Sequence, residues 1–142
     1  MSGIRGKNTR PEWKVRRYLH ARGFRFRLNV KRLPGKPDIV LPKYRLVIFV
    51  HGCFWHRHPG CRLTSTPASN TDEWQAKFAA NVERDIRNQQ QLRDAGWRLL
   101  ILWECGLRKE DSALDWLPVW ICGNDVYQEW PDIRADNKES SQ

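Results

Sequence analysis

Histidine and cysteine gather in one short stretch of this 142-residue chain. Three of the four histidines and two of the four cysteines lie between His51 and Cys61, and a further cysteine, Cys105, follows a distant apolar segment. Thiolates and imidazoles are the usual ligands of a structural Zn²⁺, which needs ligands from one loop and others from elsewhere in the chain. The stretch therefore predicts a structural zinc site.

Four residues form the zinc-binding set that we predict: Cys53, His58, Cys61 and Cys105. His56 competes with His58 for the histidine position. The alternatives are two disulfides or inert buried thiols, and Cys122 is interpreted as a small buried hydrophobe. The first residues lack the apolar core of a secretion signal, so we expect a cytoplasmic protein, in which disulfides are uncommon.

A single carboxylate is the second candidate for chemistry. Asp38 follows Pro37 and opens an apolar segment that ends at Leu41. A carboxylate in this position can hold Mg²⁺, which takes oxygen ligands and keeps several waters, and a backbone carbonyl such as that of Val50 would complete the site. An Asp after a Pro is more often a turn or strand cap, so Asp38 alone does not establish a metal site.

Positive charge is concentrated in the first third of the chain. The whole chain has 25 Lys and Arg against 16 Asp and Glu, a net charge of +9. Residues 1–50 contain 14 basic and 2 acidic residues, a net charge of +12. Residues 51–142 contain 11 basic and 14 acidic residues, a net charge of −3. This asymmetry favours a polyanionic partner, nucleic acid first and an anionic membrane surface second, over a merely soluble surface. The candidate phosphate contacts are Lys14, Arg16, Arg17, Arg25 and Arg27.

The N-terminal part of the chain predicts one helix followed by three strands. The helix begins with Thr9 as its cap and ends before Gly23, the residue type that most often terminates a helix. Apolar and basic residues then alternate over residues 24–30, which is typical of a strand. Apolar segments at residues 38–41 and 45–50 predict two more strands, the second of them central and buried.

A loop, two helices and a strand follow. Residues 51–71 show no periodicity and predict a loop, and residues 71–95 predict a long helix. An apolar residue recurs at every fourth position of this helix: Trp74, Phe78, Val82 and Ile86. A buried strand is expected at residues 97–103, and a last helix at residues 109–121 with a break near Pro118.

This order of elements predicts an α/β fold with a small mixed sheet flanked by helices. No apolar run approaches the roughly 18 residues of a membrane span, so no spanning segment is expected. We expect one domain over residues 1–130, with a DNA-binding helix region at its N-terminus, and a polar, frayed tail over residues 131–142. Two neighbouring central strands would bring Cys53 and Cys105 to the same edge of the sheet.

Five segments together resemble the very-short-patch repair (Vsr) DNA mismatch endonucleases, over about residues 4–122. The most specific segment is HGCFWHRHPGC at residues 51–61. The others occur in the matching order: KNTRPE at 7–12, LPGKPDIV at 33–40, NVERD at 81–85 and WEC at 103–105. The resemblance implies a restriction-endonuclease-like core, with structural zinc held by the Cys and His set given above.

The same resemblance implies a Mg²⁺-dependent DNA endonuclease. It implies a nick in one strand, 5′ to the thymine of a T:G mismatch left by deamination of 5-methylcytosine, which starts very-short-patch repair. Asp38 and the carbonyl of Val50 would hold Mg²⁺, with two ions in all. His56 would be the catalytic base, supported by Glu12. The residues that would hold the waters around the metal are His51 and Asp85.

The resemblance also implies how the enzyme meets its substrate, double-stranded DNA with a T:G pair. Three aromatic residues would wedge into the duplex beside the mismatch: Phe54, Trp55 and Trp74. Wedging costs least at a mismatch, which makes it a source of selectivity. The alternative for Phe54 and Trp55 is packing over the zinc site. The polar residues that would contact DNA are Lys77, Asn81 and Arg84.

A monomer at the bacterial nucleoid is implied, with mismatch-repair proteins as a further candidate partner. Two other functions stay open at this level. One is a zinc-stabilised DNA-binding module without catalysis, in which Asp38 and His56 have no chemical role. The other is a nuclease of related fold that acts on other lesions.

Overall fold

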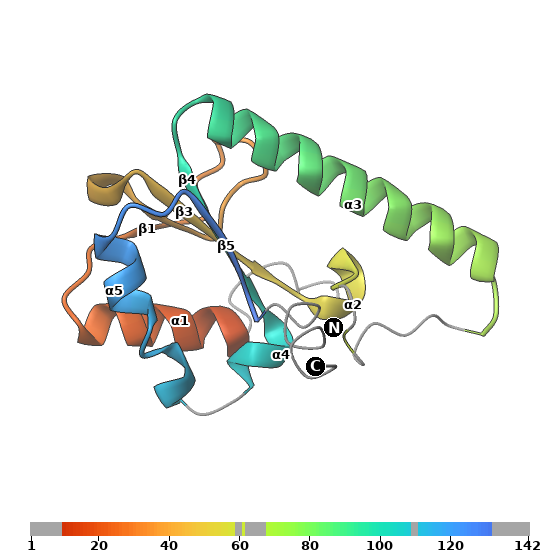
Figure 1. Ribbon diagram of the computed structural model, residues 1–142. Coiled ribbons are helices and arrows are strands. Elements are labelled where there is room, and N and C mark those ends of the chain that lie inside the picture. Colours follow the sequence, from red (N-terminus) through yellow and green to blue (C-terminus); the bar gives the residue numbers. More distant parts are fainter. Residues whose placement is uncertain (1–9, 59–60, 62–67, 109–110, 132–142) are drawn as a thin grey trace, which may run out of the picture.

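The computed structural model describes most of the chain (Figure 1). Outside the described part lie residues 1–9, 59–60, 62–67, 109–110 and 132–142, and of Phe54, Trp55 and Asp111 only the backbone is described. The predicted helix cap Thr9 and nearly all of the predicted tail therefore lie outside the described residues. No described helix is both long and apolar enough to cross a membrane.

Five strands form one mixed sheet in the order β1-β2-β3-β4-β5. Their bounds are β1 (Arg27–Leu28), β2 (Ile39–Leu41), β3 (Leu46–His51), β4 (Arg98–Trp103) and β5 (Tyr127–Trp130). β1 and β2, and β2 and β3, pair antiparallel, whereas β3, β4 and β5 run parallel. The long connection from β3 to β4 carries the helix that a parallel crossover requires.

Helices cover both faces of this sheet (Figure 1). Their bounds are α1 (Arg10–Ala21), η2 (Pro42–Tyr44), α2 (Cys53–His56), α3 (Thr71–Asp94), α4 (Glu104–Leu107), η3 (Asp111–Leu114) and α5 (Leu117–Cys122). α1 and α5 lie on one face, and the C-terminal half of α3 lies on the other. The predicted α/β class, a small mixed sheet flanked by helices, is therefore confirmed.

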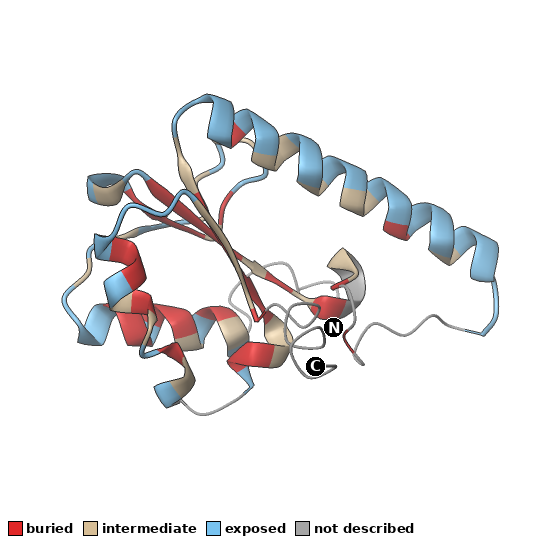
Figure 2. Cartoon of the chain, viewed as in Figure 1, coloured by how far each residue is buried: buried red, intermediate tan, exposed pale blue. Residues whose placement is uncertain are grey.

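Successive residues of the central strands point to opposite faces and build two cores. Ile48, Leu100 and Leu102 contribute to a core shared with α1 and α5, whereas Val47 and Ile101 contribute to a core shared with Leu92 of α3. Figure 2 shows the strands buried between these layers. The central strands are thus apolar on both faces, as their unbroken apolar sequences predict.

The register of the central strands positions the later chemistry. β3 and β4 pair in parallel, with His51 opposite Trp103. Cys53 and Cys105 each follow this pair by two residues. Both cysteines therefore leave the sheet at the same edge, as predicted.

The predicted strand over residues 24–30 forms only in part. Only Arg27 and Leu28 pair with β2, because β2 itself is three residues long. Asn29 has a φ of 49°, which ends the extended backbone directly after Leu28. Leu28 is 40% exposed, whereas Phe24 still packs against the α1 core.

Three short elements were not predicted: α2, α4 and β5. α2 forms inside the predicted loop, α4 follows β4 directly, and β5 adds a parallel strand beside β4. The helix expected over residues 109–121 with a break near Pro118 forms as two pieces, η3 and α5, and Pro118 lies in the first turn of α5. Proline tolerates that position because a first-turn residue needs no N–H partner.

The apolar stripe predicted for α3 is only partly buried. Phe78 is buried, but Ile86 is 62% exposed, and Leu92 makes the contact with the sheet. A step of four residues advances about 40° around a helix with 3.6 residues per turn. Ile86 therefore lies about 120° away from Trp74, so the two side chains cannot share one face. Most of α3 remains exposed (Figure 2).

Candidate active site and metal centre

A cavity of about 570 Å³ opens where β3 leaves the sheet, between α1, α2 and α3. All of the residues that the family resemblance implies for catalysis line it: Glu12, Asp38, Val50, His51, His56 and Asp85. They come from five separate segments of the chain. The cavity therefore unites residues that only the fold can bring together.

Asp38 reaches this cavity from the turn that precedes β2. Gly35 in this turn has a φ of +75°, and a Cβ there would lie 3.1 Å from Cβ of Asn88 and 3.2 Å from the ring of Phe49. Only glycine fits this close approach without strain. The turn thus packs against α3 and closes one wall of the cavity.

The Asp38 carboxylate replaces a backbone partner of β3. The pairing of β2 with β3 ends at Ile39 and Ile48, and beyond it the N–H of Val50 donates to Oδ2 of Asp38 at 2.7 Å. In a strand, the N–H and C=O of one residue face the same side. The carbonyl of Val50 therefore faces the same side as Asp38.

The pKa of Asp38 is raised to about 7, mainly by burial and in addition by the negative charge of Glu12. The hydrogen bond from Val50 and the nearby His56 and Arg16 oppose this shift. A buried carboxylate beside another acid is a group that a cation would stabilise. The donor set at Asp38 therefore fits a hard divalent ion.

Glu12 and Arg16 form a buried pair on one side of α1. Arg16 Nη2 lies 3.3 Å from Oε1 of Glu12, and both residues are almost inaccessible to solvent. Arg16 is thus not available as the surface phosphate contact that the sequence suggested. Its charge instead partly balances the two carboxylates of the cavity.

Two histidines and an aspartate form a compact group at the cavity wall. His56 Nδ1 lies 2.6 Å from Oδ2 of Asp85, and the rings of His51 and His56 stack 3.9 Å apart. The ligand atoms of the three residues lie within 4.8 Å of one another. With its proton shared with Asp85 at Nδ1, His56 keeps Nε2 for another partner.

His51 is buried and electrically neutral. Burial lowers the pKa of His51 well below its usual range, and His56 and His58 lower it further. Among the described residues, its Nδ1 has no hydrogen-bond partner. A buried ring nitrogen without a protein partner points to a ligand or a water.

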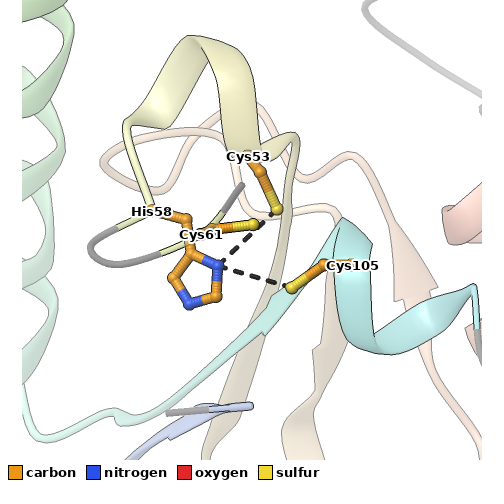
Figure 3. A group of neighbouring side chains, drawn as sticks. All are labelled: Cys53, His58, Cys61 and Cys105. Carbon is orange, nitrogen blue, oxygen red and sulfur yellow. Dashed lines mark hydrogen bonds between the residues drawn. The ribbon is translucent and has the colours of Figure 1, made fainter. Parts of the chain in front are cut away.

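The predicted zinc-binding set is assembled at the same edge of the sheet (Figure 3). The ligand atoms of all four residues lie within 4.8 Å of one another: Cys53, His58, Cys61 and Cys105. His58 Nδ1 lies 3.6 Å from Sγ of Cys53 and 3.5 Å from Sγ of Cys105. None of the four cysteines forms a disulfide, and Cys122 is exposed, so its interpretation as a small buried hydrophobe is wrong. The cluster could hold a metal ion, consistent with a zinc site.

Groups outside the set hold His58 in place. Its Nε2 lies 3.0 Å from the carbonyl oxygen of Pro131, and its ring stacks on Trp103 at 4.2 Å. A hydrogen bond from Nε2 to a carbonyl leaves the Nδ1 lone pair directed at the sulfurs, as in metal-binding histidines generally. The sequence did not indicate Pro131, because any residue type can supply a backbone carbonyl.

Burial raises the pKa of the Cys53 thiol, and the neighbouring thiols raise it further. The pKa of Cys105 is raised for the same reasons. Thiolates crowded in this way need a cation to be stable, since a metal replaces the protons. The electrostatics of the cluster thus agree with its geometry.

The residues implied for DNA contact lie along α3 at helical spacing. Trp74 is half-buried, and its ring lies 5.7 Å from that of Phe78. Lys77 lies over the Trp74 ring at 5.3 Å, and Arg84 donates to the side-chain oxygen of Asn81. The side chains of Phe54 and Trp55 lie outside the described residues.

Arg57 and Glu104 were not predicted, yet each connects parts of the site. The guanidinium of Arg57 lies 3.8 Å above the ring of Phe78 and so joins α2 to α3. Glu104 lines the cavity, accepts a 3.4 Å hydrogen bond from the N–H of Cys53 and pairs with Arg108 at 2.8 Å. A lone arginine or glutamate carries no distinctive sequence signal, since most are solvated surface charges.

The fold and site thus define an α/β protein in which a carboxylate–histidine cavity adjoins a Cys₃His cluster. The family described as DNA mismatch endonuclease Vsr matches residues 1–62. A curated DNA mismatch endonuclease Vsr from Escherichia coli strain K12 is 44% identical over 128 residues, covering 87% of this chain and 81% of that protein.

Two nicking enzymes are also similar. Type II nicking enzyme V.XorIIP of Xanthomonas oryzae pv. oryzae is 54% identical over 107 residues, covering 75% of this chain and 78% of its own. V.NmeAIP of Neisseria meningitidis is 48% identical over 110 residues, covering 78% of each chain. The chain belongs to the Vsr family of DNA mismatch endonucleases. It is therefore a nuclease that acts on the phosphodiester bonds of DNA.

Proposed function

We propose that this endonuclease nicks one DNA strand 5′ to the thymine of a T:G mismatch produced by deamination of 5-methylcytosine. The observation that carries the proposal is the cavity that Asp38, Glu12 and the His56–Asp85 pair share beside the Cys₃His cluster. Such a nick would start very-short-patch repair.

Mg²⁺ is the cofactor we propose, held by Asp38 and the carbonyl of Val50. The raised pKa of Asp38 supports this, because a divalent cation would stabilise the charged form of a carboxylate that lies near Glu12. Two Mg²⁺ ions would neutralise the charge that develops on the scissile phosphate and its leaving oxygen. The buried Nδ1 of His51 is a candidate for holding a water at the edge of this site.

His56 is the general base in this proposal. Its Nδ1 is engaged by Asp85 at 2.6 Å, which orients the ring and leaves Nε2 to take a proton from the attacking water. Glu12 would assist from α1 as a second carboxylate at the cavity. An unprotonated imidazole suits this role near neutral pH.

Recognition would depend on α2 and α3, both of which contribute residues to the cavity. Phe54, Trp55 and Trp74 are the proposed wedges at the mismatch, where unstacking costs least. The proposed polar contacts to DNA are Lys77, Asn81 and Arg84. The exposed length of α3 supports this assignment, since few of its residues pack against the rest of the protein.

We assign Zn²⁺ to Cys53, His58, Cys61 and Cys105 as a structural ion. It would tie α2, which carries the wedges and His56, to the end of β4. We further propose that one domain acts as a monomer at the bacterial nucleoid, and that mismatch-repair proteins are candidate partners.

The test is a nicking assay on matched duplexes. One duplex contains a single T:G pair, and its controls contain T:A or C:G at the same position, each labelled on either strand. With Mg²⁺ we expect one product, cut 5′ to the mismatched thymine. Asp38→Asn should abolish the nick and retain binding to the duplex.

Other outcomes have definite meanings. Cutting of other mismatches at equal rates would replace T:G specificity by a broader lesion nuclease. Binding without cutting, in the presence of Mg²⁺ and retained zinc, would contradict the enzyme proposal and favour a DNA-binding module. Full activity of Asp38→Asn would refute the metal assignment.

A further inference from the structure

A second cavity, of about 750 Å³, lies beside the catalytic one, and two of the candidate phosphate contacts from the sequence, Lys14 and Arg17, line it. It is formed by the first turns of α1 and by α4 with the residue that follows it. Its charged side chains are Arg10, Lys14, Arg17, Arg108 and a single acid, Glu104. The cavity is therefore strongly cationic.

The spacing of residues on α1 separates two charged faces. Arg10, Lys14 and Arg17 are four and three residues apart, so they lie on one face of the helix and line the second cavity. Glu12 and Arg16 lie on another face, where Glu12 lines the catalytic cavity. α1 thus contributes side chains to the walls of both cavities.

The walls of the second cavity are fixed by hydrogen bonds. Lys14 Nζ donates to the carbonyl of Leu107 at 2.8 Å and ties α1 to α4. Arg108 is held by Glu104 at 2.8 Å. The side chains of Arg10 and Arg17 make no hydrogen bond or ion pair with any other described residue. These two guanidinium groups are the candidates for an external anion.

The two cavities adjoin each other. Pro11 and Glu104 line both of them. Trp13 stands at the second cavity with 52% of its surface exposed, which is unusual for so large an apolar ring. A cationic cavity with an exposed indole, next to a cavity that cleaves DNA, matches the backbone of that DNA in charge and in apolar sugar surface.

We propose that this second cavity binds the sugar-phosphate backbone of the DNA strand adjacent to the phosphate that is cut. This rests on the proposed function, because it takes DNA as the substrate. Each strand carries one phosphate per roughly 3.4 Å of duplex length, so neighbouring phosphates lie beside any strand held in the catalytic cavity. Arg10 and Arg17 neutralise them, and Trp13 packs against the deoxyribose.

The experiment measures the binding of a T:G duplex with Ca²⁺ in place of Mg²⁺, as a function of salt. The variants are Arg10→Gln and Arg17→Gln in the full chain. The control is Arg93→Gln, an equally exposed arginine in the last turn of α3. We expect a roughly 3–10-fold weaker Kd for each cavity variant and a decrease of about 0.9 in the slope of log K against log salt for each lost contact.

A second part of the experiment locates the contact along the DNA strand. Duplexes with one uncharged methylphosphonate linkage are scanned across the cut site. Loss of charge at linkages next to the cut should weaken binding by the wild type, but should weaken binding by Arg17→Gln much less at the same linkage. Equal Kd values for all three variants, or no linkage coupled to Arg17, would overturn the proposal.

The outcome is independent of mismatch specificity. A T:A duplex should lose the same affinity on Arg17→Gln, because phosphate contacts do not depend on sequence. A protein that fails to nick at T:G but shows the coupled linkage would contradict the proposed function and retain this site. An unchanged DNA affinity would instead leave an acidic protein as the occupant and refute the inference.

Discussion

One carboxyl of the catalytic cavity, Asp38, shows how the fold prepares a residue for metal. Its Oδ2 satisfies the N–H of Val50, and its surroundings raise its pKa to about 7. The charged form is therefore disfavoured in the absence of a cation. A divalent ion would reverse that preference, so protons and Mg²⁺ should compete for this group.

The first prediction concerns stability and pH in the metal-free state. The pKa of Asp38 is about 7 in the folded protein, against 3.8 ordinarily. Because the folded pKa is raised, the contribution of Asp38 to the free energy of unfolding is fully present below about pH 4 and is lost as the pH rises to about 7. The loss between these two pH values is at most about 4 kcal/mol. Asp38→Asn should remove this dependence.

The measurement is the free energy of unfolding of wild type and Asp38→Asn, with zinc retained and Mg²⁺ absent, from pH 5 to 8. We expect Asp38→Asn to become the more stable protein as the pH rises. Adding Mg²⁺ at pH 8 should stabilise wild type and not the variant. Parallel stability curves for the two proteins would contradict the assigned pKa.

At the scale of elements, the parallel pair β3 and β4 explains why the two metal-binding groups adjoin each other. Both strands end at the same edge, where one leads into α2 and the other into α4. Long apolar or periodic segments made α1, α3, β3 and β4 predictable, although the periodic stripe of α3 is only partly buried. The Cys₃His cluster was predictable because thiols and imidazoles at that spacing have few other uses than metal binding.

Other elements depend on contacts that the sequence does not encode locally. β5 is half-buried along its whole length and has no alternating pattern, so only its pairing with β4 makes it a strand. α2 is a single turn. The helper groups at the sites, Glu104 and the carbonyl of Pro131, become visible only when distant elements meet.

The second prediction tests the contact between α4 and the end of β5. A Cβ on Gly106 would lie 2.5 Å from Cδ of Pro131 and 2.8 Å from the ring of Trp130. Gly106→Ala should displace Pro131 and weaken its hydrogen bond to His58. We expect a loss of about 1–3 kcal/mol of stability and a roughly 10–100-fold weaker affinity for zinc.

A chelator competition assay and thermal unfolding measure these two quantities. The matched control is Gly52→Ala, whose Cβ would meet only Oε1 of Glu104 at an ordinary 3.8 Å. Gly52 also has a φ of −73°, which alanine adopts without strain. Equal zinc affinity in the two variants would show that Pro131 does not support His58.

At the scale of the molecule, one end of the sheet carries all of the proposed chemistry. The catalytic cavity, the cationic cavity and the Cys₃His cluster lie together there, on elements drawn from most of the chain. Of the basic residues in the first third of the chain, α1 places Arg16 in an internal pair and three others at the second cavity: Arg10, Lys14 and Arg17. We therefore expect the attraction of DNA and the choice of the cut site to depend on different residues at this one end of the sheet.

The third prediction is that metal at the Cys₃His cluster stabilises this whole end. Cys61→Ser should lose zinc and lower Tm by roughly 10 °C or more, because a loss of a few kcal/mol shifts Tm by about 3–5 °C per kcal/mol at this size. Cys122→Ser is the control, since Cys122 is exposed and outside the cluster. Metal content by atomic emission and unfolding by circular dichroism measure the two effects. A Cys61→Ser protein with wild-type Tm would refute a structural role.

Because the parallel strands β3 and β4 are far apart in the sequence, the residues that follow them are synthesised at different times. Cys105 follows Cys61 by 44 residues, most of them in α3 and β4. A ribosome that adds roughly 5–20 residues per second needs about 2–9 s to make that segment. During this interval the nascent chain exposes an incomplete set of three ligands. Binding of a metal ion by all four residues of the cluster would therefore wait until the crossover helix and its strand have been translated.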